Sequence, residues 1–355
     1  MHRCGAFFCF IFVEMKNIII FLFLILCRTS FSQAQFIQYY SNINLAQHYF
    51  IDKQYFKADS CYKVAFALDS IRGFNQDYLC AASNSLYIKD AALTKVYLYG
   101  YAKRGGNYKK IKTRRVKGKT TLDSIFFKDK VLRKRMSVAF KEYKKTLNKK
   151  VISKIRHIVI RDQMARVGPV NLLPWKIQRK IMIKVDKRSI KELLLICEQY
   201  GWPGYNLIGE FRPWGKSSIN GADLIIRHFP MEELKELETY VFEAIKQVNE
   251  YPLAWAKAVD YCYLGFPFCK EDSIKFVFAQ KYGTLLSHGS MFSEDTAIAN
   301  KILIIPFGKI EEVNKVRKEL FLEPIEDYCK WYNAILPKEE KGIQYKNKKG
   351  NYTVY

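Results

Sequence analysis

The chain has 355 residues, of which 49% are hydrophobic, and it carries a formal net charge of +25. This length accommodates one to three domains, and the apolar content excludes a disordered chain. The charge is concentrated, because residues 103–156 hold 21 lysines and arginines against three acids, and the rest of the chain is close to balanced.

The first predicted element is a targeting segment. Lys16 precedes an apolar run from Ile18 to Cys27, and small residues suited to cleavage follow. A run of roughly ten residues is short for a bilayer span, which takes about 20. We therefore expect residues 1–34 to be a signal peptide, with Met15 as an alternative start. The expectation is a bacterial protein exported to the periplasm, the outer surface or the medium; an uncleaved anchor is the alternative.

An internal repeat occupies residues 35–106. Two segments carry small residues at matching positions: Ala46 corresponds to Ala82 and Ala58 to Thr94, in both cases 36 residues apart. Small side chains at these positions allow two antiparallel helices to pack closely. The pattern resembles the tetratricopeptide repeat, whose unit has about 34 residues. The resemblance implies two helix pairs, and because about three repeats are needed for an independent stack, we expect the following helix to cap them.

Residues 107–150 form a basic linker and helix. After a loop-like start, apolar residues recur at three- and four-residue steps from Asp123 onwards, which predicts one amphipathic helix capped by Asp123 or Thr121. The basic surface of residues 103–156 is either a solvated face or a binding surface for an anionic lipid or polysaccharide. Nucleic acid is disfavoured as a partner, because export would separate the protein from it.

The segment of residues 151–336 is predicted to be helical throughout. Pro230 and Pro252 precede two apolar stripes, and proline favours the first turn of a helix. Strand-like alternation is missing, although "KILIIPF" is compatible with one short strand. Residues 337–355 are polar and are expected to form a loose tail. The predicted fold class is therefore all-α, with a short tetratricopeptide-like repeat module followed by a helical bundle domain.

Polar residues interrupt the apolar faces of this bundle in an ordered set of motifs. The motifs are "RDQMAR", "GWPG", "LIIRHF", "KAVDYC" and "AQKYGT", followed by "VNKVRKELFLEPIEDY". Their order and spacing resemble a helical bacterial domain family of unknown function, and the resemblance covers residues 155–336. Two departures stand out, because Tyr261 and Leu285 occupy positions where the family has arginine and glutamine. If those side chains serve a ligand in the family, this copy has lost or altered the activity.

Each of these polar residues has a structural and a functional interpretation. Asp162 and Arg166 are four residues apart, which either stabilises the helix by an ion pair or holds the arginine for an anion. His228 is either a hydrogen-bonded core residue or a general base with Asp260 as its carboxylate partner. Trp202 either wedges its turn onto the core through the indole N–H or forms the wall of a ligand pocket.

Two functional hypotheses follow. The first is an exported helical-repeat scaffold that binds a protein or peptide partner. The second is a hydrolase-type enzyme with His228, Asp260 and Arg166 as catalytic residues. No phosphate loop, dinucleotide motif, serine-nucleophile motif or metal-ligand spacing occurs in the sequence, so we expect no cofactor and no metal. The candidate ligand-binding residues are Asp162, Gln163, Arg166, Trp202, His228, Gln280, Tyr282 and Thr284.

Overall fold

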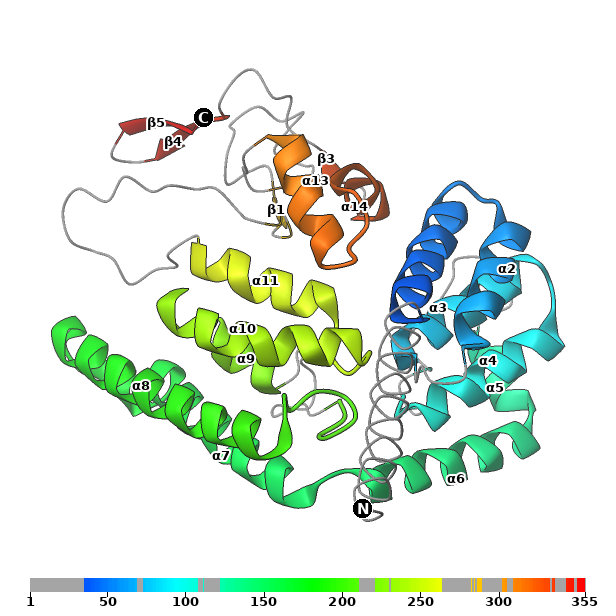
Figure 1. Cartoon of the computed structure of the whole chain (residues 1–355), viewed down its shortest axis with the longest axis horizontal. Coiled ribbons are helices and arrows are strands. Elements are labelled where there is room, and N and C mark those ends of the chain that lie inside the picture. Colours follow the sequence, from blue (N-terminus) through cyan, green and yellow to red (C-terminus); the bar gives the residue numbers. More distant parts are fainter. Residues whose placement is uncertain are drawn as a thin grey trace, which may run out of the picture.

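The structure is a computed structural model in which helices dominate, so the all-α prediction is confirmed (Figure 1). It describes residues 35–68, 73–107, 111, 122–210, 221–229, 231–263, 282, 284, 286–288, 302–304, 309–332, 334–335, 343–347 and 350–354.

Two pairs of helices form the N-terminal module. A helix over residues 35–51 is followed by α2 (Tyr55–Phe66), and α3 (Asn75–Tyr87) is followed by α4 (Ala91–Lys103). The carboxylate of Asp90 caps α4 by accepting a 2.8 Å hydrogen bond from an amide of its first turn. Only residues 52–54 and 88–90 separate the helices of the two pairs, so each pair is a helical hairpin with a short connection.

The two connections have the same geometry. Lys53 and Lys89 lie 36 residues apart, and both adopt left-handed backbone angles, with φ of 61° and 59°. The matching residues Ala58 and Thr94 are both fully buried. The larger Thr94 is tolerated because its hydroxyl lies 2.7 Å from the Ser85 hydroxyl, so no polar atom is left unpaired there. The module is thus built from paired helices, an arrangement compatible with helical repeats.

The basic segment forms two helices where one was predicted. These are α5 (Leu122–Lys128) and α6 (Lys130–Thr146), and α6 packs along α4. Asp129 separates them, because its carboxylate accepts a 2.8 Å hydrogen bond from an amide in the first turn of α6. Thr121 lies outside the described residues. A residue that the sequence pattern placed inside a helix is therefore the cap of a new one.

The C-terminal bundle is organised around a long helical hairpin of α7 (Lys149–Val167) and α8 (Trp175–Tyr200). A short 3-10 helix, η2 (Pro169–Leu172), joins the two. The other helices among the described residues of the bundle are α9 (Gly221–Ile226), α10 (Met231–Lys246), α11 (Pro252–Tyr263), α13 (Ile310–Glu319) and α14 (Ile325–Tyr332).

The described part of the chain also contains five short strands. In one sheet β2 (Ile302–Ile304) pairs antiparallel with β1 (Leu286–His288) and parallel with β3 (Ala334–Ile335), so the "KILIIPF" strand is present. In the polar C-terminal segment, where a loose tail was expected, β4 (Ile343–Asn347) and β5 (Gly350–Val354) form an antiparallel hairpin.

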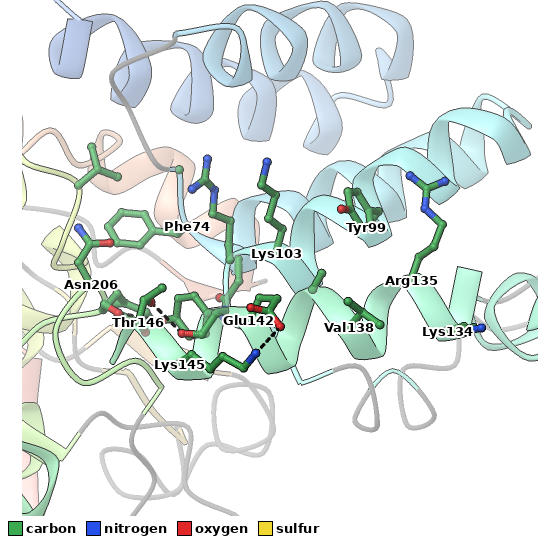
Figure 2. Close-up of a pocket in the computed structure, with 17 residues that line it drawn as sticks. Phe74, Tyr99, Lys103, Lys134, Arg135, Val138, Glu142, Lys145, Thr146 and Asn206 are labelled. Carbon is green, nitrogen blue, oxygen red and sulfur yellow. Dashed lines mark hydrogen bonds and ion pairs between the residues drawn. The ribbon is translucent and has the colours of Figure 1, made fainter. Parts of the chain in front are cut away.

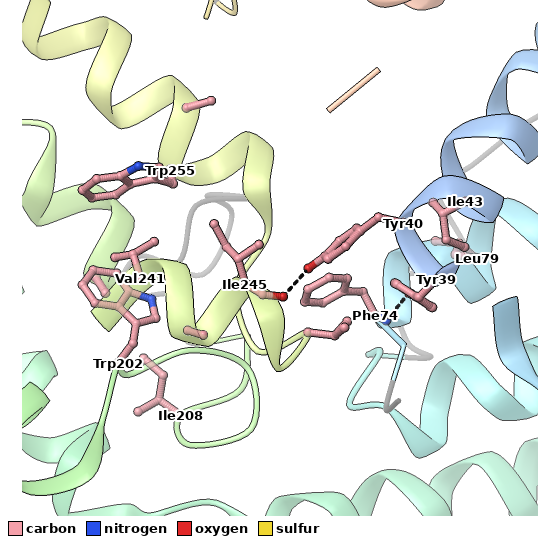
Figure 3. Packing of buried hydrophobic residues seen from close by; sticks show 14 of the residues in the cluster. Tyr39, Tyr40, Ile43, Phe74, Leu79, Trp202, Ile208, Val241, Ile245 and Trp255 are labelled. Atoms are coloured by element: carbon pink, nitrogen blue, oxygen red, sulfur yellow. Dashed lines mark hydrogen bonds between the residues drawn. The ribbon is translucent and has the colours of Figure 1, made fainter. Parts of the chain in front are cut away.

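One large apolar cluster includes residues of both the N-terminal module and the bundle and joins the two (Figure 3). The Tyr40 hydroxyl donates a 2.9 Å hydrogen bond to Ile245 O at the end of α10, and its ring stacks on Phe321 with centroids 5.4 Å apart. The ring of Phe74, which precedes α3, stacks on Tyr251 at 3.8 Å. The two helix pairs are therefore stabilised from both sides, by α6 along α4 and by the bundle against the first helix.

Candidate functional site

Asp162 on α7 is the centre of the first group of predicted residues. Its carboxylate is fully buried and accepts a 2.7 Å hydrogen bond from Gln163 Nε2. His228 Nδ1 lies 3.1 Å from Asp162 Oδ1, and the His228 side chain is 21% exposed. His228 thus has the carboxylate neighbour that would orient a general base. That neighbour is Asp162 and not Asp260, the partner expected from the sequence.

Arg166 connects this group to α8. Its Nη2 donates a 2.7 Å hydrogen bond to Asp186 Oδ1, and its Nη1 lies 3.4 Å from Asp162 Oδ1 across one helical turn. Burial raises the pKa of Asp186, and the adjacent guanidinium partly opposes that change. Asp186 was not among the candidates from the sequence. Of the four ionisable members of this network, His228 is the most exposed.

Asp260 belongs to a second, separate network. Its buried carboxylate accepts hydrogen bonds from the amides of Tyr282 and Thr284, both at 2.8 Å, and from the Thr284 hydroxyl at 2.7 Å. Burial raises the pKa of Asp260, and these hydrogen bonds oppose the change. The three residues are brought together as a clamp that holds the segment around residues 282–284 onto α11.

Arg317 and Tyr328 complete the second network, although neither was a candidate residue. Arg317 Nη1 donates a 2.8 Å hydrogen bond to Tyr282 O, and its Nε donates to Glu323 O at 2.6 Å. The Tyr328 hydroxyl donates a 2.7 Å hydrogen bond to Thr284 O, and the guanidinium lies 4.9 Å from its ring centroid. Both residues belong to the closing motif "VNKVRKELFLEPIEDY", which is the signal that could have identified them.

Trp202 fastens the turn after α8 to the turn after α10. The indole is buried, and Nε1 donates a 2.6 Å hydrogen bond to the buried carboxylate of Glu250. The backbones of the two turns are also joined, because Tyr205 N donates a 2.7 Å hydrogen bond to Asn249 O. This arrangement is the wedge considered for "GWPG", and a carboxylate accepts the indole hydrogen bond.

The two glycines of "GWPG" are needed for different reasons. Gly201 has φ 75° and ψ −176°, a backbone conformation that essentially only glycine adopts, although no atom lies within 4 Å of the position a Cβ would take. Gly204 lies so close to the turn after α10 that an added Cβ would be 2.1 Å from Asn249 O. The first glycine therefore provides the backbone angle, and the second provides the close approach.

Two sequence motifs continue beyond what the structure describes. The candidate Gln280 lies outside the described residues, and so does Leu285, one of the two departures from the family pattern. The side chain of Tyr261, the other departure, is likewise not described. The candidate residues that are described fall into three groups: the Asp162 network, the Asp260 network and the Trp202 turn.

A groove of about 740 Å³ lies between α4, α6 and the turn after α8 (Figure 2). Its apolar surface is provided by four aromatic side chains together with Val138, Ala139 and Val248. The Tyr143 hydroxyl donates a 2.7 Å hydrogen bond to Tyr205 O, which ties α6 to the turn at one end of the groove. The aromatic side chains are Phe74, Tyr99, Tyr143 and Tyr205.

Cations surround this groove. Of the residues that the structure describes, five lysines and arginines and a single acid line it, and that acid, Glu142, is paired with Lys145 at 2.8 Å. The Arg135 guanidinium lies 4.7 Å from the ring centroid of Tyr99, so a cation and an aromatic face are presented together. The predicted basic segment therefore forms part of a concave surface. The five cations are Lys103, Arg104, Lys134, Arg135 and Lys145.

Comparisons of the chain with protein-family models, curated proteins and solved structures find no match. Among the described residues, no three or more His, Cys, Asp or Glu side chains are grouped so that they could hold a metal ion. In the same part of the chain, no helix has the length and apolar character needed to cross a membrane. The groove and the polar networks are therefore the features of the molecule that indicate its function.

Proposed function

We propose that the protein is an exported helical-repeat scaffold that binds an extended, acidic segment of a protein or peptide partner in the groove between α4 and α6. The observation that carries the proposal is the combination of four aromatic rings and five cations among the described residues of one groove, where the single described acid is paired with one of these cations and the other four remain. Aromatic and arginine side chains are the residues that contribute most to binding energy at protein interfaces.

The construction of the module supports this role. The paired helices and the 36-residue spacing of Lys53 and Lys89 fit tetratricopeptide-like repeats, and such arrays present extended concave surfaces to their partners. The groove is formed where α4, the last helix of the second pair, packs along α6. The basic character of residues 103–156, attributed above to an anionic partner or to solvation, then contributes to recognition by attracting an acidic segment.

The test uses the chain from residue 35 onward to select binding peptides from a random dodecapeptide library. The affinity of the selected peptides is then measured by fluorescence anisotropy at low and high salt. We expect acidic peptides to be enriched. The double variant Lys103→Glu/Arg135→Glu should bind these peptides more than about tenfold more weakly. The affinity of the unmodified chain should fall as the salt concentration rises.

A matched control keeps the same change in net charge. Lys235→Glu with Lys318→Glu alters two exposed lysines on α10 and α13, neither of which lines the groove. Peptide binding by this variant should equal that of the unmodified chain. If both double variants weaken binding equally, the effect is one of net charge and the groove is not the binding site.

The hydrolase-type alternative is favoured by one observation, the hydrogen-bonded pair of His228 and Asp162 with Arg166 beside it. A histidine oriented by a buried carboxylate is the arrangement of a general base. His228 does not line the groove. His228→Ala should therefore leave peptide binding unchanged. If the unmodified chain cleaves a selected peptide and His228→Ala does not, the protein is an enzyme and the scaffold proposal is replaced.

A further inference from the structure

The end of the α7–α8 hairpin presents apolar side chains to solvent. Leu172 in η2 is 88% exposed and Val167 at the end of α7 is 70% exposed. Isolated exposed leucines and valines are ordinary, but a contiguous group marks an interaction surface. The group, here called the hairpin tip, consists of Ile160, Met164, Val167, Leu172, Leu173, Trp175, Ile177 and Ile183, all more than one-third exposed.

The members of the hairpin tip on α7 share one helical face. Ile160, Met164 and Val167 follow one another at steps of four and three residues, which places them in line along the helix. Leu172 and Leu173 follow in the connection between α7 and α8, and both are exposed. In Figure 1 the hairpin end projects beyond α10 and α11, so the tip is offered to a partner outside the fold.

The charge at the hairpin tip has one sign. Residues 163–185 contain no aspartate or glutamate. Arg166 is used in the ion pairs with Asp162 and Asp186, while Lys176, Lys180 and Lys184 are exposed on α8. Apolar side chains with a tryptophan, next to lysines and without acids, form the pattern of helices that lie at a membrane interface.

We propose that the hairpin tip docks the protein onto an anionic lipid bilayer, with Leu172 and Trp175 at the level of the headgroups and the lysines of α8 on the lipid phosphates. Charge complementarity selects this partner, because each lysine near an anionic leaflet adds to the attraction and no acid opposes it. The tip and the peptide groove are separate sets of residues. Docking therefore leaves the groove available, and neither proposal depends on the other.

The experiment is sedimentation of the chain from residue 35 onward with vesicles of phosphatidylcholine alone, or containing about one-third phosphatidylglycerol. We expect binding to the anionic vesicles and little to the neutral ones. Val167→Ser with Leu172→Ser should weaken binding by at least about tenfold, because burial of one such side chain accounts for roughly that factor. Brominated lipid should quench Trp175, so the quenching should be lost in Trp175→Phe.

Two controls separate the hairpin tip from other surfaces. Phe56→Ser with Val131→Ser removes side chains that are 74% and 69% exposed on α2 and α6, and it should leave vesicle binding unchanged. Lys134→Glu with Lys141→Glu and Lys144→Glu brings the net charge of the basic helix α6 to zero. The proposal is overturned if these α6 substitutions abolish binding while the tip substitutions do not. It is equally overturned if the unmodified chain ignores anionic vesicles, or if the tip substitutions only dissociate an oligomer.

Discussion

Asp77 on α3 should make the stability of the protein depend on pH near neutrality. Its carboxylate is buried in the core that joins the N-terminal module to the bundle, and it accepts a hydrogen bond from the Tyr39 hydroxyl. That hydroxyl in turn accepts a 3.0 Å hydrogen bond from Phe74 N. Burial raises the pKa of Asp77 to about 7 from its ordinary 3.8, and the hydrogen bond from Tyr39 opposes this change.

The direction of the effect follows from proton binding. Between pH 4 and 7 the folded state holds a proton on Asp77 that the unfolded state releases, so the free energy of unfolding falls as pH rises through this window. The stabilisation is fully present below the ordinary pKa and is lost as pH rises through about 7. A tenfold change in a protonation equilibrium is worth about 1.4 kcal/mol, so the total is on the order of 4 kcal/mol.

Asp77→Asn isolates this contribution, since asparagine stays neutral and still offers an oxygen to the Tyr39 hydroxyl. The assay is urea unfolding of both proteins at intervals from pH 4.5 to 8.5. We expect similar stability at the acidic end and an increasing advantage for the variant toward pH 8. Parallel stability curves would refute the reasoning, because they would mean that Asp77 carries the same charge in the folded and unfolded states across this range.

Two further predictions concern the "GWPG" turn. Gly201→Ala and Gly204→Ala should each lower the free energy of unfolding by roughly 1–3 kcal/mol, the first through backbone strain and the second through overlap with Asn249 O, as measured by chemical denaturation. Trp202→Phe should lower the free energy of unfolding by at least about 1–3 kcal/mol, because Glu250 stays buried and loses the indole donor to one of its carboxylate oxygens. Recovery of stability in Trp202→Phe/Glu250→Leu would show that the lost indole hydrogen bond to this carboxylate is the cause.

The local features of the fold were largely predictable, because they depend on nearby residues. The small residues at Ala58 and Thr94 indicated closely packed helices, and the matching turns at Lys53 and Lys89 follow from the same 36-residue period. The break at Asp129 was missed for a reason that is also local. Aspartate is a strong N-cap residue, but an amphipathic stripe that continues across it hides the boundary.

The partners of the buried charges were less predictable, because they lie far apart in the chain. His228 is 66 residues from Asp162, and Trp202 is 48 residues from Glu250. Apolar periodicity locates a helix face but does not determine which two faces meet, and His228 was accordingly assigned to Asp260. Asp162 and Asp260 both interrupt apolar stretches of sequence. Asp162 lies beside His228 because α7 packs against α9, the helix that precedes His228.

Substitutions in the Asp162 network test whether Arg166 has a structural or a functional role. Its guanidinium lies between two mostly buried carboxylates, Asp162 and Asp186. If the contact is structural, Arg166→Met removes the positive charge between these two acids and should lower the free energy of unfolding by about 3–5 kcal/mol. The double variant Arg166→Met/Asp186→Leu should recover much of that stability. Because Arg166 opposes the raised pKa of Asp186, removing it should raise this pKa further, so the deficit of the single variant should shrink as pH falls. A loss below about 1 kcal/mol that does not vary with pH would contradict the structural role and leave the arginine available for an anionic ligand beside His228.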